Sequence, residues 1–146
     1  MKVAVSAQGP DLEALIDPRF GRCSYFIIVD TETLDFEAIQ NPAQTAMGGA
    51  GIQASQLVLS KGVEAVITGN VGPNAMQALQ AAGIKVFSTS GGTVEENLQR
   101  LKEGTLVEIS QATVPPHAGM GRGMGGGRGM GGGRGIGGGR GGRWSR

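Results

Sequence analysis

The amino-acid sequence predicts one α/β domain built on a mixed sheet, followed by a tail with no apolar core of its own. Three observations favour this. Short runs of β-branched and aromatic residues alternate with segments of helical periodicity. Glycine-rich turns separate the two kinds of segment. After Pro115-Pro116 the apolar pattern stops, so the 146 residues hold one core of ordinary domain size.

Five short apolar runs predict the strands of the sheet. The first three open the chain, and a polar turn separates the second from the third. The fourth has the form of a short buried strand, and the fifth follows the second helical segment. The predicted strands are Lys2–Ser6, Tyr25–Asp30, Leu34–Gln40, Glu64–Thr68 and Ile84–Ser88. Leu106–Ile109 offers a further short edge strand outside these five.

Three segments have the periodicity of helices. The first spans Gly51–Lys61 and stops at Gly62, because glycine is favoured just past a helix end. The second begins at Pro73, since proline is tolerated in a first helical turn. The third follows the sequence Thr93–Glu96, which has the form of a capping box.

The element order β-β-β-α-β-α-β-α restricts the sheet. Right-handed crossovers make the strands that begin at residues 2, 64 and 84 parallel, and hairpin pairing makes the strand at residue 25 antiparallel. The expected fold is a ribonuclease H-like three-layer domain with a mixed five-stranded sheet. In such open sheets, ligands bind beyond the carboxyl ends of the parallel strands.

Those carboxyl ends are short, polar and rich in glycine, at Ser6–Gly9, Thr68–Gly72 and Ser88–Gly92. Glycine lets backbone N–H groups approach a ligand, and helices begin close by. An anion would therefore gain hydrogen bonds and a favourable interaction with the helix dipoles. We expect an anion pocket here; the alternative is that Gly and Ser serve only as turn residues.

The sequence offers no set of residues for catalysis. Two-metal nucleases need carboxylates on the central strands, but the first strand has none and Asp30 stands at a hairpin corner. The single histidine, His117, lies in the tail, and no Gly-x-Ser-x-Gly motif is present. We therefore expect a protein that is not an enzyme.

Cysteine usage and hydropathy bound the location and the kinds of site. The single cysteine, Cys23, excludes an internal disulfide and an all-cysteine metal site within one chain. No run approaches the roughly 18 apolar residues of a membrane helix, and the N-terminus enters a strand pattern at once. We expect a cytoplasmic protein.

Charge divides the chain at the composition change. Residues 1–116 hold seven Lys/Arg and twelve Asp/Glu, a net charge of −5, whereas residues 117–146 hold six Arg and no acid, a net charge of +6. The tail repeats the unit Arg-Gly-Met-Gly-Gly-Gly, which has too few apolar residues to bury a core. We expect a folded domain over residues 1–112 and a disordered Gly/Arg/Met-rich tail over residues 113–146.

The role of the tail stays open among three interpretations. A solubilising or self-associating extension comes first. Arg-Gly repeats also bind RNA nonspecifically, although such segments usually interleave Phe or Tyr, and this tail has only Trp144. The thioethers of Met120, Met124 and Met130 could instead recruit a soft metal such as Cu(I).

Four linked motifs follow one another along the chain: Asp17–Asp30 (DPRFGRCSYFIIVD), Gly49–Ala54 (GAGIQA), Val66–Ala75 (VITGNVGPNA), and Ala82–Val86 (AGIKV) with Gly91–Val94 (GGTV). Together they resemble the motifs of the dinitrogenase iron-molybdenum cofactor biosynthesis family. This is the NifX, NafY and NifB C-terminal group, with the orange protein of sulfate reducers. The resemblance spans residues 1 to about 110 and implies the ribonuclease H-like fold. It also implies non-enzymatic binding or carriage of an anionic metal-sulfur cluster, either an iron-molybdenum cofactor or precursor or a molybdenum-copper sulfide.

The matched motifs and the strand ends give the candidate site. Arg19 and Arg22 would neutralise an anion, Cys23 would offer a soft thiolate, and Met47 a weak thioether. Each has an ordinary alternative: the arginines in surface ion pairs, Cys23 as a buried small hydrophobe, and Met47 as a loop residue. The cofactor-binding candidates are Arg19, Phe20, Gly21, Arg22, Cys23, Gly49, Ala50, Gly51, Thr68, Gly69, Asn70, Gly91, Gly92 and Thr93, and the metal-ligand candidates are Cys23 and Met47.

Two functions of different class follow. The first is a carrier of a molybdenum-containing metal-sulfur cluster, whose partners would be cofactor-assembly proteins or a MinD-type ATPase. The second is a regulatory module that uses the same crevice for a partner or a small anion without metal, with possible nonspecific nucleic-acid binding by the tail. We expect a monomer or weak homo-oligomer, and we do not expect nucleic acid or membrane as the main partner.

Overall fold

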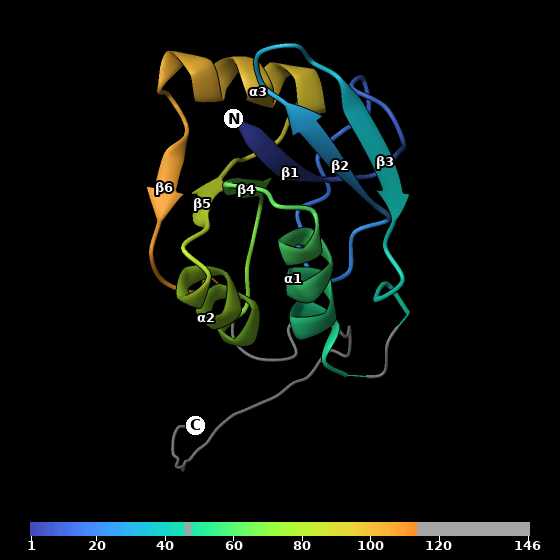
Figure 1. The fold of residues 1–146 in the computed structure, drawn as a ribbon, viewed down its shortest axis with the longest axis vertical. Coiled ribbons are helices and arrows are strands. Elements are labelled where there is room, and N and C mark those ends of the chain that lie inside the picture. The colour runs from blue at the N-terminus through green and yellow to red at the C-terminus, as the bar shows by residue number, and fades with distance from the viewer. Residues whose placement is uncertain (46–47, 114–146) are drawn as a thin grey trace.

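The computed structural model describes residues 1–45 and 48–113, which form one mixed sheet with helices on both faces (Figure 1). The sheet order is β3-β2-β1-β4-β5-β6. The strands are β1 (Lys2–Ala7), β2 (Tyr25–Asp30), β3 (Phe36–Gln40), β4 (Ala65–Thr68), β5 (Lys85–Ser88) and β6 (Val107–Ile109). The helices are α1 (Ala50–Ser60), α2 (Pro73–Ala81) and α3 (Val94–Glu103).

The strand directions follow the sequence prediction. β1 pairs in parallel with β4, and β4 pairs in parallel with β5. The chain reverses between β1 and β2 and again between β2 and β3, and both pairs are antiparallel. The mixed α/β character and the predicted parallel directions of β1, β4 and β5 are therefore confirmed.

The strand count is corrected from five to six. β6 pairs antiparallel with β5 and closes that edge of the sheet. It has only three residues, and Val107 is largely exposed, so the run has little apolar contrast with its surroundings. A strand this short is held by its pairing rather than by a buried face, and the sequence pattern therefore marks it weakly.

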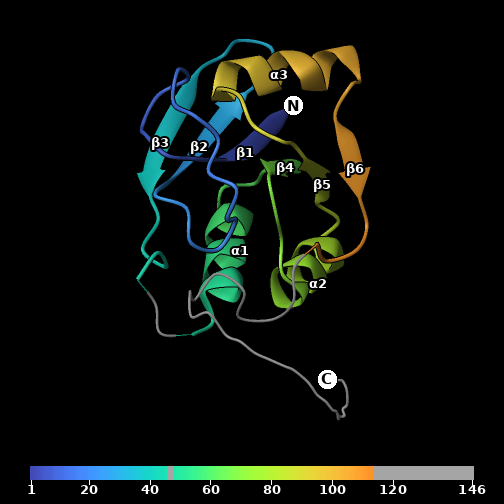
Figure 2. The same cartoon turned by 180° about the vertical axis from the view of Figure 1, so that it is seen from behind.

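The two faces of the sheet carry separate cores. α1 and α2 cover one face, where side chains such as Phe26 and Val66 meet Val58 and Leu79. α3 covers the other face, where Val94 and Leu98 pack among alternate residues of the same strands. Figures 1 and 2 show the sheet between these layers from opposite sides. The alternation of strand side chains between two apolar faces explains why the central strands are almost continuously apolar.

A long connection, residues 8–24, runs from the end of β1 to the start of β2 and is held by backbone pairing. Asn70 N–H donates to the Pro18 carbonyl at 2.7 Å, and Phe20 N–H donates to the Asn70 carbonyl at 3.2 Å. The approach is so close that a Cβ at Gly69 would lie 2.7 Å from the Pro18 Cα. Glycine at position 69 is thus required by the fold.

Two predictions, on the tail and on membrane helices, can be compared with the structure only within the described residues. Apart from its first residue, the tail predicted over residues 113–146 lies outside the residues that the structure describes, and its disorder stays a prediction. Within residues 1–45 and 48–113, none of the helices combines the length and the apolar character that a membrane crossing requires.

The Pro18 contact predicts a sharp difference between two glycine substitutions. Gly69→Ala should lower the free energy of unfolding by about 2 kcal/mol, because the new Cβ overlaps backbone atoms that cannot move independently. Gly72→Ala should cost less than about 1 kcal/mol, because a Cβ there meets no described atom within 4 Å. Urea unfolding followed by circular dichroism measures both, and equal stabilities would contradict the contact.

Candidate functional site

The carboxyl ends of the parallel strands β1, β4 and β5 lie together at one end of the sheet, and polar groups connect them. We name this end of the sheet the edge; it is distinct from the outer strands β3 and β6. The hydroxyl of Ser6 lies 2.6 Å from the Asp17 carbonyl oxygen and 2.7 Å from the hydroxyl of Thr68. Both side chains are fully buried. Thr68 was expected to face a ligand, but its hydroxyl instead bonds to that of Ser6 and so joins the end of β4 to the end of β1.

Arg19 and Asp17 form an ion pair at this edge. The carboxylate of Asp17 is almost completely buried and accepts bonds from the backbone N–H of Arg19 at 3.0 Å and from its Nε at 3.2 Å. The partner carboxylate raises the pKa of the Arg19 guanidinium above its ordinary value. Because the Arg19 side chain is about half exposed, part of its guanidinium faces outward from the pair. The expectation of an ion pair and that of a ligand-facing cation are therefore compatible.

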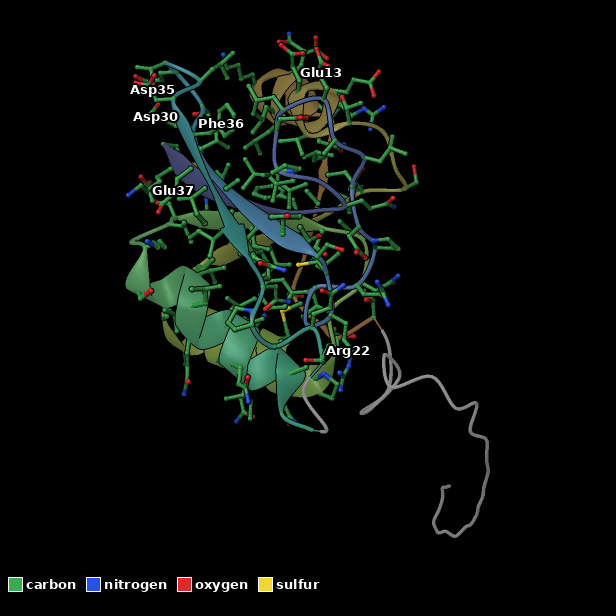
Figure 3. All side chains as sticks on the ribbon, turned by 90° about the vertical axis from the view of Figure 1, so that its right-hand side faces the viewer. Glu13, Arg22, Asp30, Asp35, Phe36 and Glu37 are labelled. Carbon is green, nitrogen blue, oxygen red and sulfur yellow. The ribbon has the colours of Figure 1, made fainter. Side chains whose placement is uncertain are left out.

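Arg22 is the second cation of the same connection. Its Nη1 donates to the Gln44 carbonyl at 3.1 Å, in the segment that leads toward α1. The side chain is half-buried, and Figure 3 places it at the end of the molecule far from Asp30 and Asp35. This bond uses one of the five N–H donors of the guanidinium and directs the side chain toward the start of α1.

The starts of α1 and α2 lie against this connection and against each other. A Cβ at Gly21 would lie 3.0 Å from the backbone nitrogen of Gly51, in the first turn of α1. A Cβ at Gly51 would in turn lie 3.2 Å from the Cβ of Ala75, in the first turn of α2. Small residues at these three positions bring two helix N-termini and one loop into direct contact.

Both N-termini keep their electropositive character. The residues before α1 and α2 are Gly49 and Gly72, neither of which supplies a side-chain cap, and the first turns contain no acid. In α1 the first helical bond is donated by Gln53 N–H to the Gly49 carbonyl. For the preceding N–H groups of Ala50 and Gly51, no acceptor is found among residues 1–45 and 48–113. These groups can donate to an anion.

The Gly91–Thr93 turn differs from the other predicted strand ends. It begins α3, on the opposite face of the sheet, and the N–H groups of Gly91 and Thr93 already donate to the side-chain oxygens of Thr89 and Glu96. Thr93 and Glu96 form a reciprocal capping box. The next two N–H groups, of Val94 and Glu95, donate to the carbonyls of Ala14 and Leu12 at 2.9 Å each. Gly91, Gly92 and Thr93 therefore start α3 and lie beside the connection, where the Gly92 carbonyl accepts from Ile16 N–H at 2.9 Å, and they are not part of the starts of α1 and α2.

Cys23 and Phe20 point into the protein. Phe20 packs against Phe26 with ring centroids 5.2 Å apart. Cys23 is fully buried, and desolvation, reinforced by the negative charge of Asp17, raises the pKa of its thiol far above the ordinary value. A neutral, enclosed thiol is a poor metal ligand, because the thiolate is the ligating form. The alternative of a buried small hydrophobe describes this position better than a ligand does.

Direct protein ligation of a metal has little support in the described residues. Residues 1–45 and 48–113 contain no group of three His, Cys, Asp or Glu side chains arranged to hold an ion. Met47, the second predicted metal ligand, lies outside the described residues, immediately before Gly48 and Gly49. The candidate site is therefore built from backbone N–H groups and two arginines.

Two residues that support this edge were not predicted from the sequence. The buried Asn41 donates through Nδ2 to the carbonyls of Gly21 and Cys23, at 3.0 Å each, and so holds the connection in place. Thr113 bonds to Val71 near the start of α2. The signal for Asn41 is an Asn-Pro pair directly after a strand, whereas nothing local in the sequence marks Thr113.

The state of Cys23 predicts its reactivity. In the folded protein at about pH 8, a thiol reagent should react at least about 100-fold more slowly than with the same chain in urea, because burial suppresses both access and the thiolate. The chain has one cysteine, so reagent uptake reports on this position alone. Equal rates in the two conditions would mean that the side chain reaches the surface.

Comparison with known proteins shows where this architecture occurs. The apo form of the orange protein from Desulfovibrio gigas is 43% identical, with a TM-score of 0.75, over 77% of this chain and 96% of that one. A NifB-like protein from Thermotoga is 42% identical, with a TM-score of 0.69, over 77% and 97% of the two chains. An uncharacterised protein from Methanocaldococcus jannaschii is 34% identical over 94 residues, which cover 62% of this chain and 80% of that protein.

A family model described as dinitrogenase iron-molybdenum cofactor matches residues 1–104. The match includes the connection before β2, the starts of α1 and α2, and all three helices, so it covers the whole candidate edge. The chain belongs to the dinitrogenase iron-molybdenum cofactor family.

Proposed function

We propose that this protein binds and carries an anionic metal-sulfur cluster at the edge formed by residues 17–22 and the first turns of α1 and α2. The observation that carries the proposal is the side-by-side placement of two uncapped helix N-termini with Arg19 and Arg22 in the adjoining loop. Membership of a family named for the iron-molybdenum cofactor supports a cluster as cargo.

The geometry supplies what an anion needs. Free N–H groups at a helix start donate hydrogen bonds and present the positive end of the helix dipole. Guanidinium groups add charge-assisted bonds, which are stronger than neutral ones. Asp17 is the one acid within residues 17–22, and its charge is paired with Arg19. A sulfide-bridged anion would be held by electrostatics and hydrogen bonding rather than by protein ligands.

These groups are consistent with a protein that carries its ligand without catalysing a reaction. Backbone amides and arginines do not change protonation state near neutral pH, and they are not nucleophiles. The cargo would be an iron-molybdenum cofactor or precursor, or a molybdenum-copper sulfide. A site open to solvent at a sheet edge would let a cofactor-assembly protein or a MinD-type ATPase reach the cargo directly.

The direct test is anaerobic binding of tetrathiomolybdate, with and without Cu(I), followed by visible absorption and metal analysis. The full chain should take up the molybdenum sulfide in a fixed ratio and develop its absorption band. Inorganic phosphate serves as the comparison anion. A colourless, metal-free protein would overturn the carrier proposal, and preference for phosphate would favour the regulatory module instead.

Charge removal at the edge should weaken this binding selectively. Arg22→Gln should lower the affinity for tetrathiomolybdate about tenfold, because one charge-assisted contact is lost. Lys85→Gln is the matched control. It removes the same charge at the start of β5, at the other end of the parallel strands, and should change affinity less than about twofold. Similar losses in both variants would indicate a general charge effect and no site at this edge.

Cys23→Ala should leave the affinity within about twofold of the parent, since the buried thiol takes no part in the proposed contacts. The same variant should be less stable by about 1 kcal/mol, because it leaves a small gap in the core. Titration and urea unfolding measure the two effects separately. Loss of the molybdenum absorption band in a folded Cys23→Ala protein would return the thiol to the site.

A further inference from the structure

The sheet ends in two outer strands, β3 and β6, and the unpaired side of β3 is the longer of the two. β3 has five residues, whereas β6 has three. Within residues 1–45 and 48–113, β3 pairs with β2 alone and stands last in the sheet. Figure 3 looks onto this side of the molecule, where β3 runs from the end that carries Asp35 toward the end that carries Arg22. β3 therefore has one side on which a further strand can pair.

The backbone of β3 presents a regular set of unused groups on this outer side. Asn41 N–H donates to the Ser24 carbonyl at 2.9 Å, so Asn41 and every second residue before it bond to β2. The N–H and C=O groups of the alternate residues point away from β2, and no turn or loop bond within residues 1–45 and 48–113 reaches them. The residues with outward-pointing backbone groups are Phe36, Ala38 and Gln40.

These groups match those of a second copy of the same strand. A two-fold axis at Ala38 pairs β3 antiparallel with β3 of the second copy, so that Ala38 lies opposite itself and Phe36 lies opposite Gln40. Each of these pairs consists of residues whose backbone groups point outward, as a hydrogen-bonded antiparallel pair requires. The pairing also covers part of Phe36, which is 44% exposed in the single chain.

Charge along β3 favours the antiparallel arrangement. Figure 3 places the acids Asp30 and Asp35 near the start of β3 and Arg22 beyond its end. In the two-fold pair, the acidic start of each strand lies beside the Arg22 end of the other, and this happens twice. Opposite charges brought together in this way favour one register and orientation over the alternatives.

The charged residue within each outer strand separates β3 from β6. Glu37 lies opposite Ile39 of the second copy, and its carboxylate accepts from Lys61 Nζ of its own chain at 3.3 Å. In β6, by contrast, a two-fold pairing centred on the three residues places Glu108 opposite its own counterpart. Like charges directly opposite each other destabilise a strand pair. The self-pairing strand is therefore β3.

We propose that this protein forms a two-fold dimer in which the β3 strands of two copies pair antiparallel and join the two sheets into one. The same surface is used by both copies, so the assembly closes at two chains. Five residues from each strand form a small interface, and the association is accordingly weak. The inference goes beyond the proposed function and needs no bound anion, although Arg22 contributes to both surfaces.

The first measurement is the molecular mass of the full chain by sedimentation equilibrium, without tetrathiomolybdate and over a range of protein concentrations. The mass should rise from that of one chain to that of two and no further. A mass of one chain up to about 1 mM protein would overturn the dimer and leave the cluster edge standing.

The register is tested by oxidising two full-length cysteine variants at a concentration where the parent is dimeric. Ala38→Cys should give a disulfide-linked dimer, because the paired Cα atoms lie about 5.5 Å apart at the axis. Gln40→Cys is the matched control on the same strand. Its two sulfur-bearing positions lie about 14 Å apart along the paired strands, too far for a disulfide. Equal cross-linking of both variants, or none of Ala38→Cys, would overturn the proposed pairing.

Charge reversal tests the contact between the strand ends. Asp35→Lys should weaken dimerisation at least about tenfold, because it sets a cation beside Arg22 of the second copy. Glu13→Lys makes the same change of charge at an exposed position in the connection after β1, and it should stay within about twofold of the parent. Circular dichroism confirms that both variants are folded. Equal weakening in both would indicate a general charge effect and overturn the assignment to β3.

Discussion

The close packing of Pro18 on Gly69 is the constraint on which the rest of the edge depends. It locks the connection after β1 onto the end of β4 through paired backbone bonds to Asn70. Once that connection is fixed, Arg19 meets Asp17 and Gly21 meets the start of α1. Backbone contacts therefore place the loop that carries Arg19 and Arg22 against the start of α1.

The sequence predicted most of the fold because its signals are local. β-branched runs, Pro73 at a helix start and the Thr93 capping box each determine their own segment, and the parallel order follows from handedness. β6 lies outside the five predicted strands because two exposed residues and one half-buried residue carry almost no pattern. The ribonuclease H-like description and the tail disorder remain predictions.

The site was predicted less completely, for a physical reason. Glycine-rich strand ends look alike in sequence, but only long-range packing decides whether their N–H groups stay free. At the start of α3 the N–H groups of Val94 and Glu95 donate to the carbonyls of Ala14 and Leu12, whereas at the start of α1 no described group accepts from the N–H groups of Ala50 and Gly51. In the same way, Cys23 sits in a motif that resembles a ligand loop, and only the burial of its side chain shows that its sulfur faces the core.

The contact between Gly51 and Ala75 also works as a spacer. Each position carries at most one methyl group, so the two helix axes approach as closely as their backbones permit. Residue size at these positions therefore limits how close the two helix starts can lie. Larger residues at positions 51 and 75 would push the first turns of α1 and α2, and the backbone N–H groups that they present, farther apart.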